Sequence, residues 1–318
     1  MTNKSESVSG LAHFRTFGPK EIPYLKKGDK IAITCPAKKL PKPMDDATAL
    51  LKSWGLEVVI GDTVNASYHQ FAGDDGLRAK DLQGFIDDDS IKAIIAARGG
   101  YGTVRIIDKI DFSRFAVNPK WVVGFSDITV LHAHLFANYQ AQTIHGQMPV
   151  NIPDASKYSL DTLRKALFGE EVSYQFNSHD LNRSGEAIGV VVGGNLSLLI
   201  SILGSVSDYS YDGKILFIED VGEYMYSIDR MIRALDRAGK LKNLAGLIVG
   251  GFTDLKDNDI PFGQTVREII MDVVKDYDYP VCFDFPAGHI PDNQSLILGR
   301  SLTLKVDKTQ VTANYTIA

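Results

Sequence analysis

The sequence predicts an α/β fold divided into two domains. From Gly28 onward, short apolar runs alternate with amphipathic stretches, which is typical of βα units around a mostly parallel sheet. The chain has 318 residues, of which 44% are hydrophobic and 23% are charged, so it can fill one large core or two medium ones. A more polar stretch at 151–184, with one expected helix at 159–168, is interpreted as a connector between the two halves.

Residues 21–150 are predicted to form the N-terminal domain. Its expected strands are 30–34, 56–60, 91–97, 121–125 and 142–145. The first strand ends before Pro36, and a helix at 45–54 ends at Gly55. A second helix at 76–86 begins behind the capping pair Asp74-Asp75. Five strands separated in this way predict a flavodoxin-like parallel sheet.

Residues 185–318 are predicted to form a C-terminal α/β domain. Its expected strands are 187–192, 214–218, 244–249 and 281–283, and its expected helices are 195–203, 225–238 and 264–275. The apolar runs at 295–298, 302–306 and 311–315 are separated by turn residues. They are therefore predicted to close this domain as antiparallel strands.

The uncharged segment 187–206 is long enough to be weighed as a membrane span. Gly193-Gly194-Asn195 interrupts it, with a β-branched run before it and a Leu/Ile pattern at helical spacing after it. A buried strand, a turn and an Asn-capped helix explain the segment better, so no membrane partner is expected. Residues 1–20 lack the apolar core of a secretory signal and are interpreted as a polar tail.

Charge and cysteine content restrict the function further. With 34 basic and 39 acidic side chains the formal charge is −5, and there is no polybasic block, so nucleic acid is not expected as a partner. Cys35 and Cys282 are the only cysteines and lie far apart, which excludes a disulfide framework and favours a reducing cytoplasm. No two histidines have metal-ligand spacing, so no metal is expected.

Ser126 is a candidate for chemistry because it stands where a predicted buried strand runs directly into a predicted helix that extends to about residue 137. In open α/β sheets, ligands bind outside the carboxyl ends of the strands. Gly124-Phe125-Ser126-Asp127 resembles a nucleophile elbow, although Ile128 occupies the place of that motif's second glycine. The alternative is that Ser126 and Asp127 only cap the helix.

The segment Arg98-Gly99-Gly100-Tyr101-Gly102 directly follows the predicted strand 91–97. Three glycines in four positions let the backbone approach a ligand and point N–H groups at developing negative charge, as an oxyanion hole does. The segment matches neither the Walker pattern nor the dinucleotide fingerprint, so a phosphate cradle is disfavoured. A plain tight turn remains the alternative.

Glu219 and His289 are the candidates from the second half. Glu219 follows the predicted strand 214–218, where a carboxylate could orient a histidine and fix its tautomer. It could instead cap the next helix, and Glu223 is an alternative acid four residues further on. Of the seven histidines, only His289 follows a predicted strand end inside a Gly/Pro-bounded loop, and His145 is the other strand-end candidate.

Six ordered blocks of the chain are similar to those of a known family. The blocks are FAGDDGLRAKDLQ (71–83), IKAIIAARGGYGTVRIID (91–108), GFSDITVLH (124–132), GGNLSLL (193–199), GKILFIEDVGEYMYSIDRMIRAL (213–235) and PAGHIPDNQSLILG (286–299). With them the chain resembles the LD-carboxypeptidase/microcin-immunity family of serine peptidases over nearly its whole length.

This resemblance implies a serine protease whose N-terminal domain supplies the nucleophile and whose C-terminal domain supplies the acid and the base. On this sequence, Ser126 takes the role of nucleophile, His289 that of general base and then acid, and Glu219 that of its orienting partner. The oxyanion donors would be the backbone N–H groups of Gly100 and Asp127. Neither a metal nor another cofactor is implied.

The implied activity is that of a hydrolase acting in peptidoglycan recycling. Carboxypeptidases of this family cut the LD-amide bond before a terminal D-alanine in cytoplasmic murein tetrapeptides, and the resemblance also implies a homodimer. The small peptide substrate ends in a carboxylate, for which Arg98 and Arg230 are candidate partners because guanidinium groups bind carboxylates bidentately. Tyr101, inside the glycine-rich segment, is a further candidate for substrate contact.

Two other functions remain open. An immunity-type peptidase would use the same residues to cleave peptidyl-nucleotide antibiotics, and it would need an aromatic side chain to stack on the base. Trp54 and Trp121 are poorly placed for that, which favours the murein substrate. The other is a non-catalytic module in which residues 99–102 bind an anion or a nucleotide and Ser126 only caps a helix.

Overall fold

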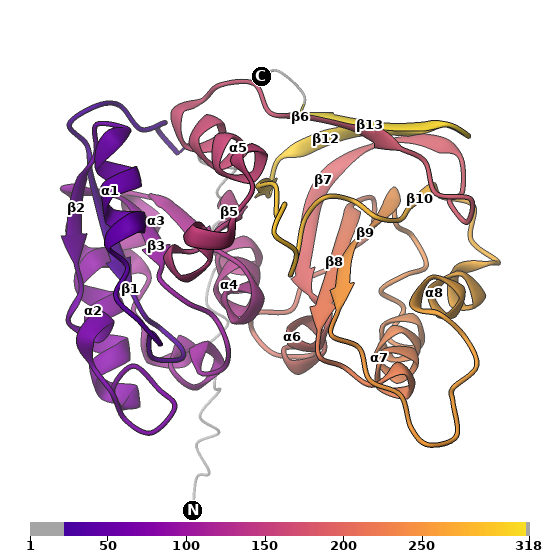
Figure 1. The fold of residues 1–318 in the computed structure, drawn as a ribbon, viewed down its shortest axis with the longest axis horizontal. Coiled ribbons are helices and arrows are strands. Elements are labelled where there is room, and N and C mark those ends of the chain that lie inside the picture. Colours follow the sequence, from indigo (N-terminus) through magenta and orange to yellow (C-terminus); the bar gives the residue numbers. More distant parts are fainter. Residues whose placement is uncertain (1–21, 316–318) are drawn as a thin grey trace, which may run out of the picture.

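The structure is a computed structural model that describes residues 22–315, so the predicted tail at 1–20 lies outside the described residues. The chain forms two β-sheets that lie side by side, each with helices packed against it (Figure 1). The N-terminal half, coloured indigo to magenta, forms most of the first sheet, and the C-terminal half, coloured pink to yellow, forms most of the second (Figure 1). The predicted α/β class is confirmed.

The first sheet has six strands in the order β11-β5-β4-β3-β1-β2. The strands are β1 Lys30–Thr34, β2 Glu57–Ile60, β3 Ile91–Ala96, β4 Trp121–Gly124, β5 Thr143–His145 and β11 Leu296–Leu298. The first five are parallel, and β11 pairs antiparallel with β5. Without β11 the order is 2-1-3-4-5, which is the flavodoxin-like order that the sequence predicts.

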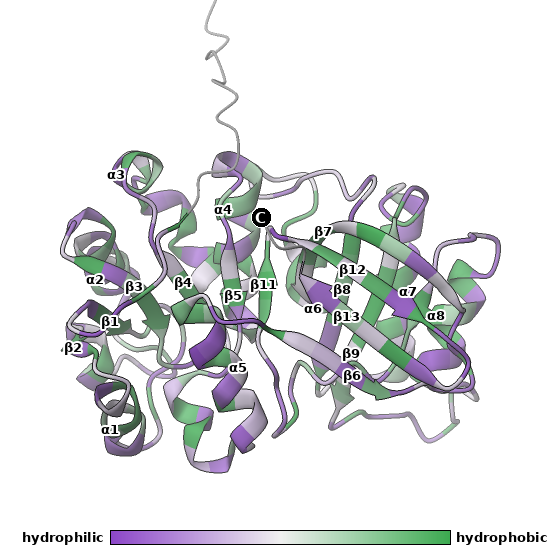
Figure 2. Cartoon of the chain, turned by 90° about the horizontal axis from the view of Figure 1, so that it is seen from above, coloured by the Kyte–Doolittle hydropathy of each residue, from purple (hydrophilic) through white to green (hydrophobic). Residues whose placement is uncertain are grey.

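The second sheet has seven strands in the order β10-β9-β8-β7-β12-β13-β6. The strands are β6 Ser173–Asn177, β7 Gly185–Asn195, β8 Ile215–Val221, β9 Gly246–Thr253, β10 Val281–Cys282, β12 Ser301–Val306 and β13 Gln310–Tyr315. β7 to β10 are parallel, and β12, β13 and β6 extend the sheet antiparallel. Buried and more exposed residues alternate along β12, as the bands of hydropathy in Figure 2 show, because only one face of this part packs on the core.

The helices are short and most begin close to where the sequence predicts them. They are α1 Asp45–Ser53, α2 Asp75–Asp87, α3 Ser113–Val117, α4 Thr129–Tyr139, α5 Lys157–Phe168, α6 Leu196–Ser201, α7 Met225–Arg237 and α8 Val266–Val274. Single 3-10 turns occur at Asp62–Asn65, Thr103–Arg105, Ile107–Lys109, Ser126–Ile128 and Pro149–Asp154. The Asp74 carboxylate accepts a hydrogen bond from Leu77 N at 2.7 Å and so caps α2 as predicted.

Two details differ from the prediction. The run at 295–298 does not close the second domain, because β11 crosses back to the edge of the first sheet, where its three side chains are buried against β5. β6, inside the predicted connector, is the edge strand of the second sheet. A strand from the C-terminal domain therefore joins the first sheet, and a strand from the connector joins the second.

The glycines at 193 and 194 also differ, because β7 runs straight through them to Asn195 instead of turning. A Cβ on Gly193 would lie 2.0 Å from Phe217 O on β8, so glycine permits close approach of two strands here. Asn195 still caps α6 as predicted, since its side chain accepts a hydrogen bond from Leu198 N. Within residues 22–315, no helix is long and apolar enough to span a membrane.

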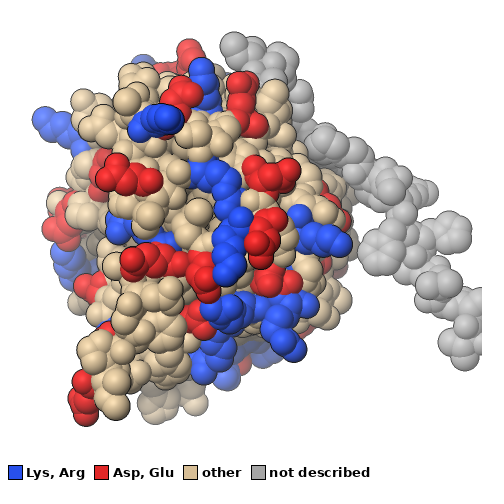
Figure 3. Space-filling view, turned by 90° about the vertical axis from the view of Figure 1, so that its right-hand side faces the viewer, with Lys and Arg blue, Asp and Glu red and all other residues tan. Residues whose placement is uncertain are grey.

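Helix α4 packs between the two halves, against β7 and α6, and its buried side chains belong to a core that continues into α7 and α8. The Thr129 hydroxyl, at the start of α4, accepts a hydrogen bond from Asn195 N at the end of β7. The face that includes α8 carries interspersed acidic and basic side chains (Figure 3). Arg233 on that side pairs with Asp229 and with Asp272, which joins α7 to α8. The shared core and the hydrogen bond between Thr129 and Asn195 join the two halves close to Ser126.

Candidate active site

Ser126 occupies a strained turn at the carboxyl end of β4. Its φ angle is 63°, a left-handed conformation that is uncommon for serine, and it begins the 3-10 turn that leads into α4. Gly124 allows the sharp bend, because a Cβ there would lie 2.9 Å from Ile128 Cγ1. The side chain of Ser126 is half-buried. A strained, accessible serine between a strand and a helix is the geometry of a nucleophile elbow.

The glycine-rich loop after β3 lies directly against Ser126. A Cβ on Gly99 would sit 2.9 Å from Ser126 Cβ and 3.2 Å from Ser126 Oγ, so no other residue fits there without displacing the serine. Gly100 has a φ angle of 110°. Within residues 22–315, the backbone N–H groups of Gly100 and Asp127 donate to no hydrogen-bond acceptor. Both N–H groups therefore remain available to an anionic ligand next to the hydroxyl.

Glu219 lies within β8, not beyond the strand end that the sequence predicts, since β8 continues to Val221. The pairing with β9 shifts register between Ile218 and Asp220, so Glu219 is the irregular residue of the ladder. Such bulges redirect a side chain. On its other edge Glu219 pairs with Asn195, the residue that contacts α4, which brings β8 close to the serine turn.

Asp220, the neighbour of Glu219, is also buried but makes different contacts. It accepts hydrogen bonds from Asn195 Nδ2 and Ser197 N, both at 2.9 Å, and so supports the start of α6. Burial, together with the charge of Glu219, raises the pKa of Asp220 to about 6. Its carboxylate has a structural role that the sequence does not reveal.

His289 lies in the loop that crosses from β10 in the second sheet to β11 in the first. Gly288 N donates to Asn293 Oδ1 at 2.8 Å, and Thr253 Oγ1 donates to His289 O at 3.1 Å. A Cβ on Gly288 would lie 2.8 Å from Glu219 Cβ, so glycine lets the loop lie on the acidic side chain. The crossing strand therefore carries the imidazole from one half of the molecule to the other.

The Nδ1 atom of His289 lies 2.5 Å from Glu219 Oε2, and the Glu219 side chain is fully buried. An ionised carboxylate only accepts, so Nδ1 carries the proton and Nε2 is left free as a base. Burial acts to lower the pKa of His289, but the charge and hydrogen bond of Glu219, with Asp220 and Asp254, outweigh it and raise that pKa above 6.5. Glu219 thus favours the protonated imidazole.

The His289 ring packs on Phe125, the residue that precedes Ser126. The ring centroids are 4.9 Å apart and the planes are inclined by 64°. Within the described residues, no hydrogen bond joins Ser126 Oγ to His289, and catalytic hydrogen bonds are often longer in ligand-free enzymes than in complexes. The structure therefore places His289 against the residue that precedes Ser126, although the two lie far apart in the sequence.

The alternative acid, Glu223, faces elsewhere. Its Oε2 accepts a hydrogen bond from Ser227 Oγ at 2.9 Å, in the first turn of α7. The geometry at His289 therefore favours Glu219 as the orienting acid.

The predicted substrate contacts are spread over two elements. Arg98 Nη1 donates to Lys39 O at 2.7 Å, and Tyr101 is 44% exposed beside it. Arg230, on α7, donates to Ser227 Oγ at 3.3 Å. Among the residues that the structure describes, neither arginine forms an ion pair, and neither donates a hydrogen bond to Ser126. Arg230 also lies over the ring of Tyr226, 5.4 Å from its centroid. The binding of a substrate carboxylate by either arginine stays a prediction.

Two side chains, the carboxylate of Asp127 and the amide of Asn293, support the site in ways that the sequence does not predict. The Asp127 carboxylate accepts a hydrogen bond from Thr103 N at 2.8 Å, which ties the serine turn to the glycine-rich loop. Burial raises the pKa of Asp127, opposed by the hydrogen bond from Thr103. Asn293 holds the backbone beside His289. Both residues lie in the blocks of resemblance, and both are polar residues that become fully buried, which only the fold reveals.

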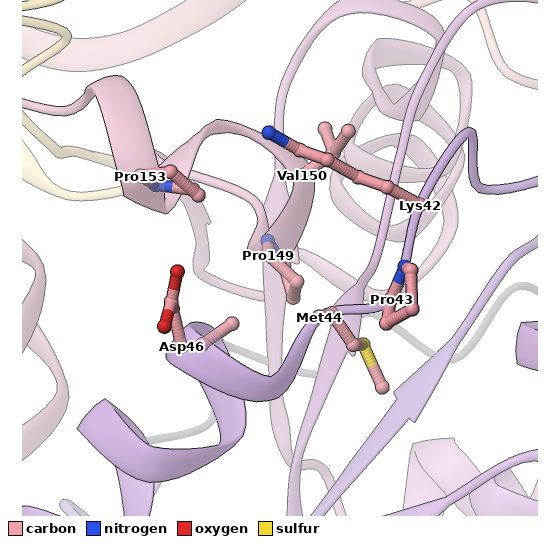
Figure 4. A pocket seen from close by; sticks show the side chains of 8 residues that line it. Lys42, Pro43, Met44, Asp46, Pro149, Val150 and Pro153 are labelled. Atoms are coloured by element: carbon pink, nitrogen blue, oxygen red, sulfur yellow. The ribbon is translucent and has the colours of Figure 1, made fainter.

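Two pockets lie beside the first sheet, and Ser126 lines neither of them. One, of about 100 Å³, lies between the start of α1 and the 3-10 turn at Pro149–Asp154, and Lys42, Met44 and Pro149 are among its lining residues (Figure 4). The other, of about 750 Å³, is lined by residues between 39 and 67. Neither contains a predicted site residue. Within residues 22–315, no cluster of three histidine, cysteine or acidic residues is placed to hold a metal ion.

Both halves of the chain match one family of known proteins. Residues 31–146 match the LD-carboxypeptidase N-terminal domain, and residues 188–304 match the LD-carboxypeptidase C-terminal domain. The chain is 33% identical to the probable murein peptide carboxypeptidase of Bacillus subtilis, over 90% of this chain and 92% of that protein. It is 27% identical to the murein tetrapeptide carboxypeptidase of Pseudomonas aeruginosa, over 87% and 93% of the two chains.

Solved structures support the same family assignment. The muramoyltetrapeptide carboxypeptidase of Oxalobacter formigenes superposes with a TM-score of 0.81 and 29% identity, over 91% of this chain and 99% of that one. The microcin C7 self immunity protein in complex with aspartyl sulfamoyl adenosine has a TM-score of 0.82 at 21% identity, over 92% and 98% of the chains, which shows a common fold. With both domains matched in order, the chain belongs to the LD-carboxypeptidase family, peptidase family S66, and is a carboxypeptidase.

Proposed function

We propose that this protein is a serine carboxypeptidase that hydrolyses the LD-amide bond before the terminal D-alanine of murein tetrapeptides. The observation that carries the proposal is the contact of 2.5 Å between His289 Nδ1 and the buried Glu219, beside the strained turn at Ser126. A hydroxyl, an imidazole and a buried carboxylate in this arrangement support acyl transfer through a covalent intermediate.

In the first half of the proposed reaction, Ser126 Oγ attacks the carbonyl carbon of the scissile amide. His289 Nε2 accepts the hydroxyl proton as the C–O bond forms. The carbonyl oxygen becomes an oxyanion, and the unpaired N–H groups of Gly100 and Asp127 donate hydrogen bonds to it. The C–N bond then breaks, and the imidazolium gives its proton to the leaving amine of D-alanine.

In the second half, water hydrolyses the acyl-enzyme. His289 Nε2 accepts a proton from the water, whose oxygen bonds to the acyl carbon, and the same N–H groups stabilise the second oxyanion. The bond to Ser126 Oγ breaks and the hydroxyl regains its proton from His289. Glu219 keeps the imidazole in the tautomer with a free Nε2 and stabilises the imidazolium in both halves.

The substrate is inferred from the relatives and from the charges around the serine. Relatives at 33% and 27% identity are named as murein peptide and murein tetrapeptide carboxypeptidases. The terminal carboxylate of such a peptide would pair with Arg98 or Arg230, beside Tyr101. Both cysteines are free, buried thiols, which supports a reducing cytoplasm and hence a role in recycling peptides taken up from the wall. We propose a homodimer on the resemblance alone.

A second candidate is cleavage of an aminoacyl-sulfamoyl nucleoside, suggested by the fold shared with the microcin C7 self immunity protein. Stacking on a base needs an accessible aromatic ring. Trp121 is fully buried and its Nε1 donates to Pro23 O at 3.0 Å, and Trp54 packs on the apolar core. Neither tryptophan is therefore placed to stack on a base.

Mass spectrometry of cleavage products tests the proposal. The protein is incubated separately with an LD-linked tetrapeptide, a DD-linked pentapeptide and an aminoacyl-sulfamoyl adenosine. We expect release of D-alanine from the LD-linked peptide alone, and no release by Ser126→Ala. Cleavage of the aminoacyl-sulfamoyl adenosine alone would show that the substrate is not a murein peptide. It would leave the proposed mechanism of Ser126 unchanged. Full activity of Ser126→Ala would refute the mechanism itself.

A further inference from the structure

Arg78, on α2, is a fully buried cation next to the glycine-rich loop. Its Nη1 donates to Pro36 O at 2.6 Å and to Gly102 O at 2.9 Å, and its Nη2 pairs with Asp75. One guanidinium group therefore joins three segments, the loop after β1, the loop after β3 and the start of α2. The planar, rigid donor geometry of arginine suits such a junction.

The contact with Gly102 is close. Gly102 has a φ angle of 145°, and a Cβ there would lie 2.6 Å from Arg78 Nη1. The next residue, Thr103, donates its N–H to the Asp127 carboxylate at 2.8 Å. Two buried charged side chains thus hold the carbonyl and the N–H of a single peptide group, Gly102–Thr103, at one end of the loop whose other end lies against Ser126. Gly100 lies between these two fixed points.

A cation at this position is costly to bury. Arg78 Nε has no acceptor and Asp127 Oδ1 has no donor within the described residues, so neither group is fully compensated. Buried ion pairs are often replaced by apolar side chains of similar volume without loss of stability. Packing alone therefore does not explain a buried arginine here, whereas exact placement of the two carbonyl groups does.

We propose that Arg78 is a positioning residue that holds the glycine-rich loop where Gly100 N–H can stabilise the oxyanion. The inference rests on the proposed function of Ser126, and it adds a residue that does not touch the substrate. Arg78 acts through the Gly102 carbonyl, while Asp127 acts both through its own N–H and through its carboxylate on Thr103. Loss of the guanidinium group would weaken the hydrogen bond from Gly100 N–H to the oxyanion, which exists only in the transition state.

Lys109 supplies a matched control. Its Nζ lies 3.7 Å from the same Asp75 carboxylate, but its side chain is half exposed and has no hydrogen bond to the loop. Lys109→Met therefore removes a positive charge from Asp75 and leaves Arg78 and Gly102 in place. Arg78→Met removes the charge and the two bonds to carbonyl groups. Arg78→Lys keeps a cation beside Asp75 and can restore only part of the donor set.

The test combines substrate kinetics with labelling of Ser126 by a phosphonofluoridate, whose phosphoryl oxygen needs the same N–H donors. For Arg78→Met we expect kcat and the labelling rate to fall 10-fold to 100-fold, with KM within about threefold, because loss of one oxyanion donor costs roughly 10²-fold to 10³-fold. We expect Arg78→Lys to be intermediate and Lys109→Met to match the wild type. The pKa on the acid side of the pH profile should not move, since His289 is untouched.

Several outcomes would overturn the inference. If folded Arg78→Met keeps kcat within twofold of the wild-type value, so that at most KM changes, then Arg78 does not position the oxyanion donor. If Lys109→Met loses as much as Arg78→Met, the effect is one of charge alone. If Arg78→Met does not fold, the comparison of Arg78→Lys with Lys109→Met decides between the two. If the wild type neither releases D-alanine nor is labelled at Ser126, the proposed function fails first.

Discussion

The two sides of the site are held in place by different kinds of interaction. On the first sheet, Ser126 is placed by backbone geometry: a left-handed φ angle, a glycine without room for a Cβ, and unpaired N–H groups. On the second sheet, His289 is placed by side chains, since Glu219 holds its ring and Asn293 holds the peptide before it. Ser126 itself is therefore placed by the shape of the backbone, with Arg78 and Asp127 behind the neighbouring loop, whereas the ring of His289 is placed directly by a charged side chain.

This difference predicts how each side fails. Substitution of Ser126 or Gly99 should lower the rate equally at every pH, because it leaves Glu219 and His289 in place. Damage to the histidine side should change the rate together with its pH dependence, because the pKa of His289 is set by neighbouring carboxylates. The following substitutions break or sharpen this contrast.

The largest effect is expected from Ser126→Ala, which removes the nucleophile and leaves both N–H donors in place. Release of D-alanine from an LD-linked tetrapeptide should fall on the order of 10⁴-fold or more at all pH values. Amino-acid analysis of the products measures this. Residual activity within tenfold of the wild type would show that another group attacks the substrate.

Glu219→Gln should have the next largest effect, about 10⁴-fold in kcat, because an amide can hold the imidazole in the wrong tautomer. The sign of the pH effect follows from the raised pKa of His289. Only the neutral imidazole acts as a base, so the wild-type rate rises with pH through a pKa above 6.5. Loss of the Glu219 charge should move this rise to lower pH. A rise that stays in place would show that Glu219 does not set the pKa.

Gly99→Ala should reduce kcat by about 10²-fold, because its Cβ would lie 2.9 Å from Ser126 Cβ and push the hydroxyl out of line. In contrast to Glu219→Gln, the pH profile should keep its shape. Steady-state kinetics between pH 5 and 9 separate the two cases. Gly84→Ala is the matched control, since a Cβ on that helical glycine meets nothing within 4 Å. Equal losses in both variants would contradict the contact argument.

The smallest effect concerns stability. His132 is buried in α4 with Nε2 2.9 Å from Gly124 O, and burial lowers its pKa to about 4. The unfolded chain, with a pKa near 6.5, binds the proton more tightly, so stability is complete above pH 6.5 and falls as the pH drops towards 4. The loss is about 3 kcal/mol for this residue. Denaturant unfolding should show a flatter pH dependence for His132→Gln. An unchanged slope would contradict this explanation.

Local signals predicted most of the fold because they act within one element. Apolar runs and caps such as Asp74 placed nearly every strand and helix of the first sheet, and the βα alternation indicated a flavodoxin-like layer. The sheet that β11 joins could not be predicted in this way. Its apolar side chains fit either sheet edge, and only the crossing loop around His289 decides which edge they extend.

The site was predictable to a different degree on each side. Ser126 and the glycine-rich segment lie where strands end, and the sequence shows this directly. Glu219 was chosen over Glu223 for a strand end that is in fact a bulge inside β8, a feature with no local sequence signal. The supporting roles of Asp127, Asn293 and Arg78 depend on burial against distant segments, so spacing alone could not reveal them.

The central claim is that Ser126 and His289 act together across the two sheets. The most direct measurement is the rate at which a phosphonofluoridate modifies Ser126, followed by mass spectrometry from pH 5 to 9 in the wild type and in His289→Ala. The account predicts modification of Ser126 alone, at a rate that rises through a pKa above 6.5 and that falls by orders of magnitude in His289→Ala. Modification that is equally fast without the imidazole would contradict it.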